Sequence, residues 1–212
     1  MLLLTGFEPN DDGINASEIV VRSLREKPPA NFPGFSDTVR CEIMPGNTNT
    51  LKAELQRVLF QHNPTICVFT GQAVGRPQIT VERLATNLRD FSVPDRAGNL
   101  VRAQSIELDG PVAYWATLPG IQKLIDVLVS SGIPASPSNH AGNHLCNQLL
   151  YHGLHLAALS TKPTPVGFIH IPALPEQSMS QWSETPSMPL EMSRRAVALL
   201  IQTLLEETEA NR

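Results

Sequence analysis

Cys146 is the cysteine best placed in the sequence to act as a nucleophile. A polar segment, residues 138–143, leads up to it, and a leucine-rich helical pattern begins immediately after it. A thiol in the first turn of a helix meets unpaired backbone N–H groups and the positive end of the helix dipole, which favour a thiolate and can stabilise an oxyanion. Cys67 falls in the apolar run 66–69, where a thiol packs as a small hydrophobe, and Cys41 falls in another predicted strand, so both are interpreted as structural. The pattern alone also allows Cys146 to be a structural cysteine beneath a helix end.

A cysteine nucleophile needs a base, and His170 is the histidine that a core strand carries. It lies near the end of the apolar run 166–171. Sites in parallel α/β sheets assemble at the carboxyl ends of strands, so an imidazole there is well placed for proton transfer. Three other histidines fall at helical or exposed positions: His62, His152 and His155.

Glu82 supplies a carboxylate in an alternating segment, residues 79–84. Carboxylates on such pleated surfaces are usually solvated. A catalytic triad, however, needs a third group that fixes the tautomer and orientation of the imidazole. Glu82 is therefore our candidate for that role, on condition that the fold brings it to His170.

Apolar runs alternate with amphipathic segments along the chain in the order of an α/β protein. Strands are expected at residues 2–5, 38–44, 65–70, 79–84, 134–138 and 166–171. Helices are expected at residues 16–26, 48–62, 121–131, 143–157 and 190–206. Residues 71–99 are interpreted as an excursion, and 175–189 as a Pro/Ser-rich loop. We expect one three-layer α/β/α domain over residues 1–212, with a largely parallel, mixed twisted sheet flanked by helices.

Composition excludes several other classes of protein. The 212 residues are 42% hydrophobic, which suffices for one sizeable core. The formal net charge of −4 and the absence of a basic run argue against nucleic acid as a partner. No apolar run approaches the roughly 20 residues that span a bilayer, and no signal peptide is recognisable, so we expect a cytoplasmic protein without a membrane partner. Three cysteines cannot form a complete disulfide framework.

Taken together, these segments resemble the pyroglutamyl peptidase I family, the pyrrolidone-carboxylate peptidases, almost from end to end. Four motifs carry the resemblance: Thr5-Gly6-Phe7-Glu8-Pro9, Gly71-Gln72-Ala73 with Gly75-Arg76 and Ile79-Thr80-Val81-Glu82-Arg83, Ser138-Asn139 with Ala141-Gly142 and Cys146-Asn147, and Gly167-Phe168-Ile169-His170-Ile171-Pro172 with Leu174-Pro175-Glu176-Gln177. The order Glu, Cys, His also fits the family.

The resemblance implies a cysteine exopeptidase that removes N-terminal pyroglutamyl residues from peptides through a thioacyl-enzyme intermediate. It implies Glu82, Cys146 and His170 as the catalytic triad, with no metal and no organic cofactor. It places Phe7, Asn10 and Gln72 at the substrate-binding pocket. It further implies a cytosolic enzyme that is a homo-oligomer, commonly a homotetramer in this family.

Three positions depart from the family pattern. Asn10 begins a loop where the family usually continues with a second phenylalanine and two glycines, so one aromatic wall of the pocket is missing or replaced. His144 stands where many members have an aromatic residue two positions before the cysteine. Ser92 replaces an arginine, whose space Arg89 or Arg96 could reach.

These departures leave alternatives open. A triad-bearing amidase or peptidase with altered selectivity for the N-terminal ring is the first, and a non-catalytic ligand-binding module on the same fold is the second. A metal site is the third, because His140 and His144 are four residues apart with Cys146 nearby, and His152 and His155 are three apart. The sequence supplies no clear third or fourth ligand at short range for either pair.

Overall fold

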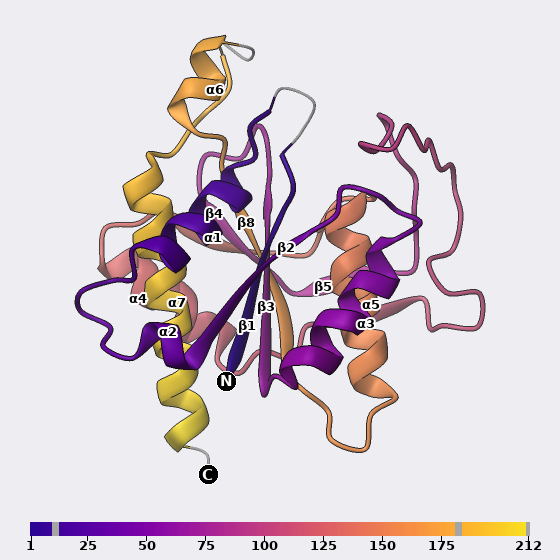
Figure 1. The fold of residues 1–212 in the computed structure, drawn as a ribbon. Coiled ribbons are helices and arrows are strands. Elements are labelled where there is room, and N and C mark those ends of the chain that lie inside the picture. The colour runs from indigo at the N-terminus through magenta and orange to yellow at the C-terminus, as the bar shows by residue number, and fades with distance from the viewer. Residues whose placement is uncertain (10–12, 181–183, 211–212) are drawn as a thin grey trace.

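A six-stranded sheet forms the centre of the computed structural model, which describes residues 1–9, 13–180 and 184–210 (Figure 1). The strands are ordered β2-β1-β3-β8-β4-β7 across the sheet. Their bounds are β1 Leu2–Phe7, β2 Val39–Met44, β3 Ile66–Gln72, β4 Ile79–Glu82, β7 Ala135–Ser138 and β8 Val166–Ile171. Neighbouring strands are parallel except for β4 and β8, which are antiparallel.

Helices cover both faces of this sheet, which gives the three-layer arrangement that the sequence predicts (Figure 1). One face carries α1 Ala16–Glu26, α2 Phe35–Thr38, α4 Ile121–Ser130 and α7 Leu190–Ala210. The other face carries α3 Leu51–His62 and α5 Leu145–Ala158. The expected α/β fold with a mixed, mostly parallel sheet is therefore confirmed.

Side chains alternate between the two faces of each strand, so the interior consists of two apolar clusters, one on each face of the sheet. Leu2 and Leu4 of β1 pack against the α1 and α7 side, whereas Leu3 and Phe7 pack against the α3 and α5 side. Helix α1 approaches β1 closely: a Cβ added at Gly6 would lie 2.6 Å from the carbonyl oxygen of Ser17. Only glycine fits there, so its lack of a side chain lets the first turn of α1 lie against β1.

Two helical segments differ from the sequence prediction. The helix expected from Asn143 begins at Leu145, because Gly142 takes a left-handed φ of 81° and His144 is extended at the cap. The segment 175–189, expected to be a loop, contains the short helix α6, Pro175–Ser180. Proline suits a first helical position, and the side-chain oxygen of Gln177 accepts a hydrogen bond from the backbone N–H of Leu174 at 3.0 Å.

The excursion after β4 forms a separate antiparallel pair, β5 Leu84–Thr86 with β6 Ala113–Trp115. The excursion is longer than the sequence indicates, because the chain rejoins the helical layer of α1 and α7 only at α4. The excursion lies beside α5 in Figure 1. Two side chains of α5 fasten it: the Tyr151 hydroxyl donates to the carbonyl of Pro111 at 2.7 Å, and Tyr114 pairs with His155 at 2.9 Å.

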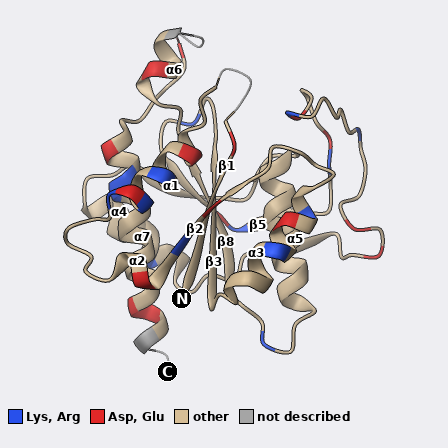
Figure 2. Ribbon diagram, in the orientation of Figure 1, with Lys and Arg blue, Asp and Glu red and all other residues tan. Residues whose placement is uncertain are grey.

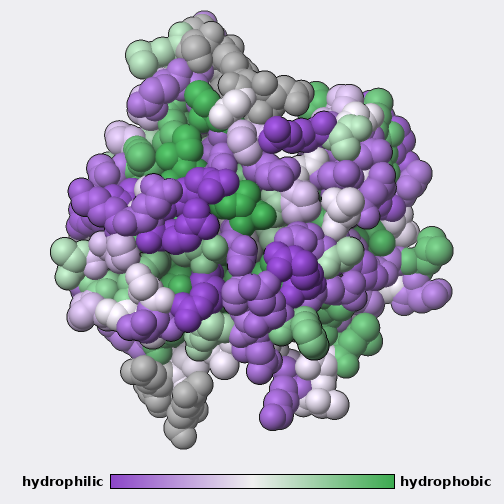
Figure 3. Space-filling view, in the orientation of Figure 1, coloured by the Kyte–Doolittle hydropathy of each residue, from purple (hydrophilic) through white to green (hydrophobic). Residues whose placement is uncertain are grey.

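Charged residues of both signs are interspersed on the outer helices, while the central strands carry few of them (Figure 2). The face drawn in Figure 3 is mostly hydrophilic, with hydrophobic residues in small groups between the hydrophilic ones. Within the described residues, none of the helices combines the length and the apolar character that crossing a bilayer requires.

Candidate active site

Glu82 and His170 meet on the sheet face that α5 covers. Strands β4 and β8 pair with Thr80 opposite His170 and Glu82 opposite Phe168, so all four side chains point to the same face. The Nδ1 atom of His170 lies 2.8 Å from Oε1 of Glu82. Glu82 is fully buried and His170 is 4% exposed. The condition set by the sequence, that the fold bring this carboxylate to this imidazole, is met.

Cys146 reaches the same face from above, as the second residue of α5. A Cβ added at Gly71 would lie 2.7 Å from the Cys146 sulfur and 2.8 Å from Cζ of Phe168. Gly71 is the register partner of His170 in the parallel pair of β3 and β8. The sulfur therefore occupies the space above Gly71, on the face from which the imidazole projects, and the missing side chain of glycine creates that space.

Arg76 is the part of the site to which the sequence analysis gave no role. It follows β3 in the turn toward β4, and its Nη1 atom lies 2.5 Å from Oε1 of Glu82. The same nitrogen donates to the hydroxyl of Thr80, while Nη2 donates to the backbone carbonyl of His140 at 2.6 Å. Its place in the glutamate motif was visible in the sequence, but its contact with the segment before Cys146 was not.

The environment of the three groups sets their protonation. Burial opposes ionisation of Glu82, but four influences outweigh it and lower the pKa to about 2: the hydrogen bond from His170, the charge of His170 when it is protonated, and hydrogen bonds from Ser138 and Arg76. Burial lowers the pKa of His170 below its ordinary value, against the opposing influence of Glu82. Burial and the nearby Glu82 carboxylate raise the pKa of the Cys146 thiol to about 12.

These directions correct one expectation. The position of Cys146 at a helix start was expected to favour the thiolate, but burial and the neighbouring carboxylate outweigh the backbone hydrogen bond that the sulfur receives. Both directions favour a neutral thiol beside a neutral imidazole. Because Nδ1 of His170 faces an ionised carboxylate, its proton resides on Nδ1, and Nε2 is left as the basic nitrogen.

The pocket residues suggested by the family resemblance lie at the carboxyl ends of β1 and β3. Phe7 ends β1 and is buried in the apolar cluster on the α5 side. Gln72 ends β3, and its Oε1 atom accepts a hydrogen bond from the backbone N–H of Ala16 at 2.6 Å. Its Nε2 atom is buried and has no hydrogen-bond partner in the part of the chain that the structure describes. Asn10 lies outside the described residues.

His144 lies at the N-cap of α5. Its ring lies over Phe91 with centroids 3.9 Å apart and the planes 36° from parallel. Its Nε2 atom lies 3.3 Å from the carbonyl oxygen of Val93, next to the exposed Ser92. His144 therefore makes a ring contact between the start of α5 and the loop that contains Ser92.

The two arginines considered as substitutes for the one missing at Ser92 differ in their contacts. Arg89 turns inward to Thr48 at 3.3 Å and to the carbonyl of Ser105 at 3.2 Å. Arg96 donates to the carbonyl of Pro9 at 2.8 Å. Arg96 is thus the one that reaches the N-terminal loop, immediately before Asn10.

Asn147 anchors helix α5 to the excursion. Its side-chain oxygen accepts from the backbone N–H of Thr86 at 2.9 Å, and its nitrogen donates to the carbonyls of Thr86 and Leu88 at 2.9 and 3.0 Å. The buried amide thereby pairs with a strand edge as another backbone segment would. Its place next to Cys146 was the only signal in the sequence.

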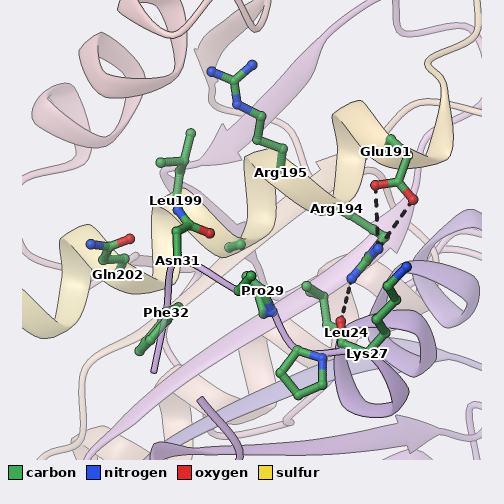
Figure 4. A pocket seen from close by; sticks show the side chains of 13 residues that line it. Leu24, Lys27, Pro29, Asn31, Phe32, Glu191, Arg194, Arg195, Leu199 and Gln202 are labelled. Atoms are coloured by element: carbon green, nitrogen blue, oxygen red, sulfur yellow. Dashed lines mark hydrogen bonds and ion pairs between the residues drawn. The ribbon is translucent and has the colours of Figure 1, made fainter. Parts of the chain in front are cut away.

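Two features away from this site bear on the alternatives that the sequence left open. Among the described residues, no group of three or more His, Cys, Asp and Glu side chains could hold a metal ion. A pocket of about 480 Å³ lies between the loop 27–32 and α7, on the other face of the sheet (Figure 4). There Arg194 bonds the carboxylate of Glu191 at 3.3 Å and the carbonyl of Lys27 at 2.6 Å.

Comparison with known proteins gives a consistent result. Residues 1–207 match the family described as pyroglutamyl peptidase. The pyrrolidone-carboxylate peptidase of Bacillus cytotoxicus is 38% identical, with 97% of this chain and 93% of the relative covered. That of Thermococcus onnurineus is 37% identical, with 97% and 98% covered.

Solved structures agree with the sequence relatives. The pyroglutamyl peptidase I from Bacillus amyloliquefaciens is 34% identical and superposes with a TM-score of 0.85 over 94% of this chain and 91% of that one. The pyrrolidone carboxyl peptidase from Thermococcus litoralis is 33% identical, with a TM-score of 0.88 over 100% and 96%.

Proposed function

The chain belongs to the pyroglutamyl peptidase family and removes N-terminal pyroglutamyl residues from peptides, and we propose that Cys146, His170 and Glu82 carry out this reaction. The observation that carries the assignment is the buried 2.8 Å contact between His170 and Glu82, on the sheet face where the Cys146 sulfur lies over Gly71. A buried carboxylate, an oriented imidazole and a thiol at a helix start together have the composition of a cysteine peptidase triad.

In the first half-reaction the sulfur of Cys146 attacks the carbonyl carbon of the pyroglutamyl residue. The thiol proton passes to Nε2 of His170 as the S–C bond forms, so the neutral resting pair needs no preformed thiolate. Backbone N–H groups of the first turn of α5 receive the oxyanion. The C–N bond then breaks, the leaving amine takes the proton from His170, and a thioacyl enzyme remains.

In the second half-reaction a water molecule attacks the thioester. His170 removes a proton from the water, the S–C bond breaks, and the sulfur recovers the proton to restore the thiol. Free pyroglutamate leaves. Glu82 stays ionised throughout and stabilises the imidazolium that forms in each half-reaction through a charge-assisted hydrogen bond.

We also propose that Phe7, Gln72 and the segment containing Asn10 recognise the lactam ring. The unpartnered Nε2 of Gln72 supports this, because a buried donor without a partner suits a carbonyl oxygen of the substrate. A neutral lactam can enter such a site, whereas a charged amino terminus would lose its hydration without compensation.

Further properties belong to the same proposal. We propose that residues 1–212 act as one peptidase domain without metal or organic cofactor, in the cytoplasm, as a homo-oligomer and specifically a tetramer. Exposed apolar side chains on the excursion, namely Leu108, Val112 and Trp115, support self-association. Sedimentation velocity tests the tetramer, and unchanged turnover in the presence of a strong chelator tests the absence of a metal.

The catalytic assignment is tested by release of a fluorophore from a pyroglutamyl amide. Cys146→Ala should abolish turnover, because no other group can form the thioester. Cys41→Ala is the matched control, since it removes a partly buried thiol in β2, away from the site, and should leave turnover intact. Residual turnover at the wild-type rate in Cys146→Ala would exclude this cysteine as the nucleophile.

A further inference from the structure

We propose that Arg76 is a positioning residue that keeps Glu82 ionised and ties this carboxylate to the segment carrying Cys146. The inference rests on the triad proposed above and extends it to a fourth side chain. It depends on three contacts of one guanidinium group, on the burial of Glu82, and on the absence, among the described residues, of another arginine or lysine paired with that carboxylate.

The contacts of Arg76 join two parts of the site that are distant in sequence. Nη1 binds Oε1 of Glu82 at 2.5 Å, and Nη2 binds the carbonyl oxygen of His140 at 2.6 Å. His140 is 64 residues farther along the chain, in the polar segment that leads to Cys146. Because the guanidinium is planar and rigid, the two bonds fix the distance between β4 and this segment.

Glu82 needs a cationic partner because it is fully buried. His170 donates one hydrogen bond to it and adds a positive charge only while the imidazole is protonated, whereas the guanidinium of Arg76 is charged at every pH of interest. Among the ion pairs of the described residues, Arg76 is the only arginine or lysine paired with Glu82. A buried carboxylate without a cation takes up a proton more readily, and a protonated Glu82 would no longer hold the Nδ1 proton of His170 in place.

The same charge acts on the imidazole. Nη1 of Arg76 lies 3.5 Å from Nδ1 of His170, and both atoms carry protons when Nδ1 faces Glu82, so this contact is repulsive. Arg76 therefore favours the neutral form of His170, which is the form able to accept the thiol proton. The charged or titratable groups that act on His170 come from the turn before β4, from β4 and from the segment before α5: Arg76, Glu82 and His140.

Arg83 provides a matched control. Its Nε atom donates to the side-chain oxygen of Asn139 at 2.8 Å, so it also ties the β4 region to the segment before Cys146. No ion pair joins Arg83 to Glu82 within the described residues. Replacing Arg83 removes a structural contact of the same kind while leaving the charge beside Glu82 intact.

The test compares pH profiles of kcat/KM for the wild type, Arg76→Met, Arg76→Lys and Arg83→Met. Arg76→Met should lower kcat/KM by about 10²-fold, as a small displacement of a catalytic group does. It should also move the acid limb upward by about 1 pH unit or more, because a cation no longer disfavours imidazolium. Arg76→Lys should keep the acid limb of the pH profile near its wild-type position, because the positive charge remains. It should recover only part of kcat, because an ammonium group lacks the planar, two-pronged geometry of a guanidinium.

Arg83→Met should leave the acid limb in place. Circular dichroism and thermal unfolding identify any variant that fails to fold, and Arg76→Lys preserves the test in that case. An unmoved acid limb in folded Arg76→Met, or equal shifts in Arg76→Met and Arg83→Met, would overturn the proposal. Cys146→Ala tests the triad separately, because this variant should lose activity whether or not Arg76 is a positioning residue. The Arg76 proposal can therefore fail while the triad proposal stands.

Discussion

Gly71 offers the sharpest test of how the thiol is positioned. In Gly71→Ala the new methyl carbon would lie 2.7 Å from the Cys146 sulfur and 2.8 Å from Cζ of Phe168. Nonbonded heavy atoms prefer separations of about 3.5–4.0 Å, so one of the neighbours must move by about 1 Å. Overpacking of this kind costs about 1–3 kcal/mol of folding free energy.

The displacement should reduce catalysis more than stability. A misplacement of about 1 Å at a reacting group lowers the rate by about 10²-fold. We therefore expect Gly71→Ala to remain folded, with kcat on pyroglutamyl amide reduced by about two orders of magnitude. Urea unfolding followed by circular dichroism gives the stability change, and fluorophore release gives kcat and KM.

Gly153→Ala is the matched control for this prediction. Its new methyl carbon would lie 2.6 Å from Cε2 of Phe69 and 3.0 Å from Val166, in the same apolar cluster but away from the thiol. It should lose comparable stability and retain most of kcat. If Gly71→Ala kept the wild-type kcat, the sulfur would not depend on the space above this glycine, and the reasoning would be refuted.

Three further predictions concern protonation. Glu82→Gln should lower kcat by about 10⁴-fold in steady-state hydrolysis, because a neutral amide no longer stabilises the imidazolium and can hold the wrong tautomer; a loss below tenfold would contradict the role of Glu82. The pKa of Glu82 is lowered from 4.5 to about 2 in the folded protein, so ionised Glu82 stabilises the fold. This stabilisation, on the order of 3 kcal/mol, is present above pH 4.5 and is lost as the pH falls toward 2. Urea unfolding from pH 5 to pH 3 should show about 2 kcal/mol of that loss in the wild type and a smaller loss in Glu82→Gln, and equal losses would argue against this role of Glu82. Alkylation of Cys146 by iodoacetamide, followed by peptide mass spectrometry, should accelerate about tenfold per pH unit between pH 6 and 9, because burial raises the pKa of this thiol to about 12, whereas a plateau there would indicate a preformed thiolate.

Local patterns in the sequence were sufficient to find the chemical groups. Cys146 at the start of a helix and His170 near the end of a core strand are both readable within a few residues, and the structure has them there. Glu82 could not be distinguished from a solvated carboxylate without the resemblance, because its burial comes from β8, which is 88 residues away at His170.

What sequence reasoning missed depends on contacts between distant segments. Arg76 gains its importance from the carbonyl of His140, and Asn147 from the edge of β5. The pKa of Cys146 depends on distant segments for the same reason: the helix start is local, whereas burial and the carboxylate of Glu82 on β4 together raise the pKa of this thiol. The Asn10 substitution lies outside the described residues, so its effect on the pocket stays a prediction.

The position of β4 in the sheet has a consequence for synthesis of the chain. Both of its neighbours, β7 and β8, come later in the sequence, so β4 cannot pair while the ribosome has delivered only the first half of the protein. The Glu82 carboxylate remains hydrated until β8 emerges and inserts between β3 and β4. Non-local pairing of this kind forms slowly. A nascent chain that lacks β8 is therefore not an active peptidase. During refolding, recovery of turnover reports that all six strands of the sheet have paired.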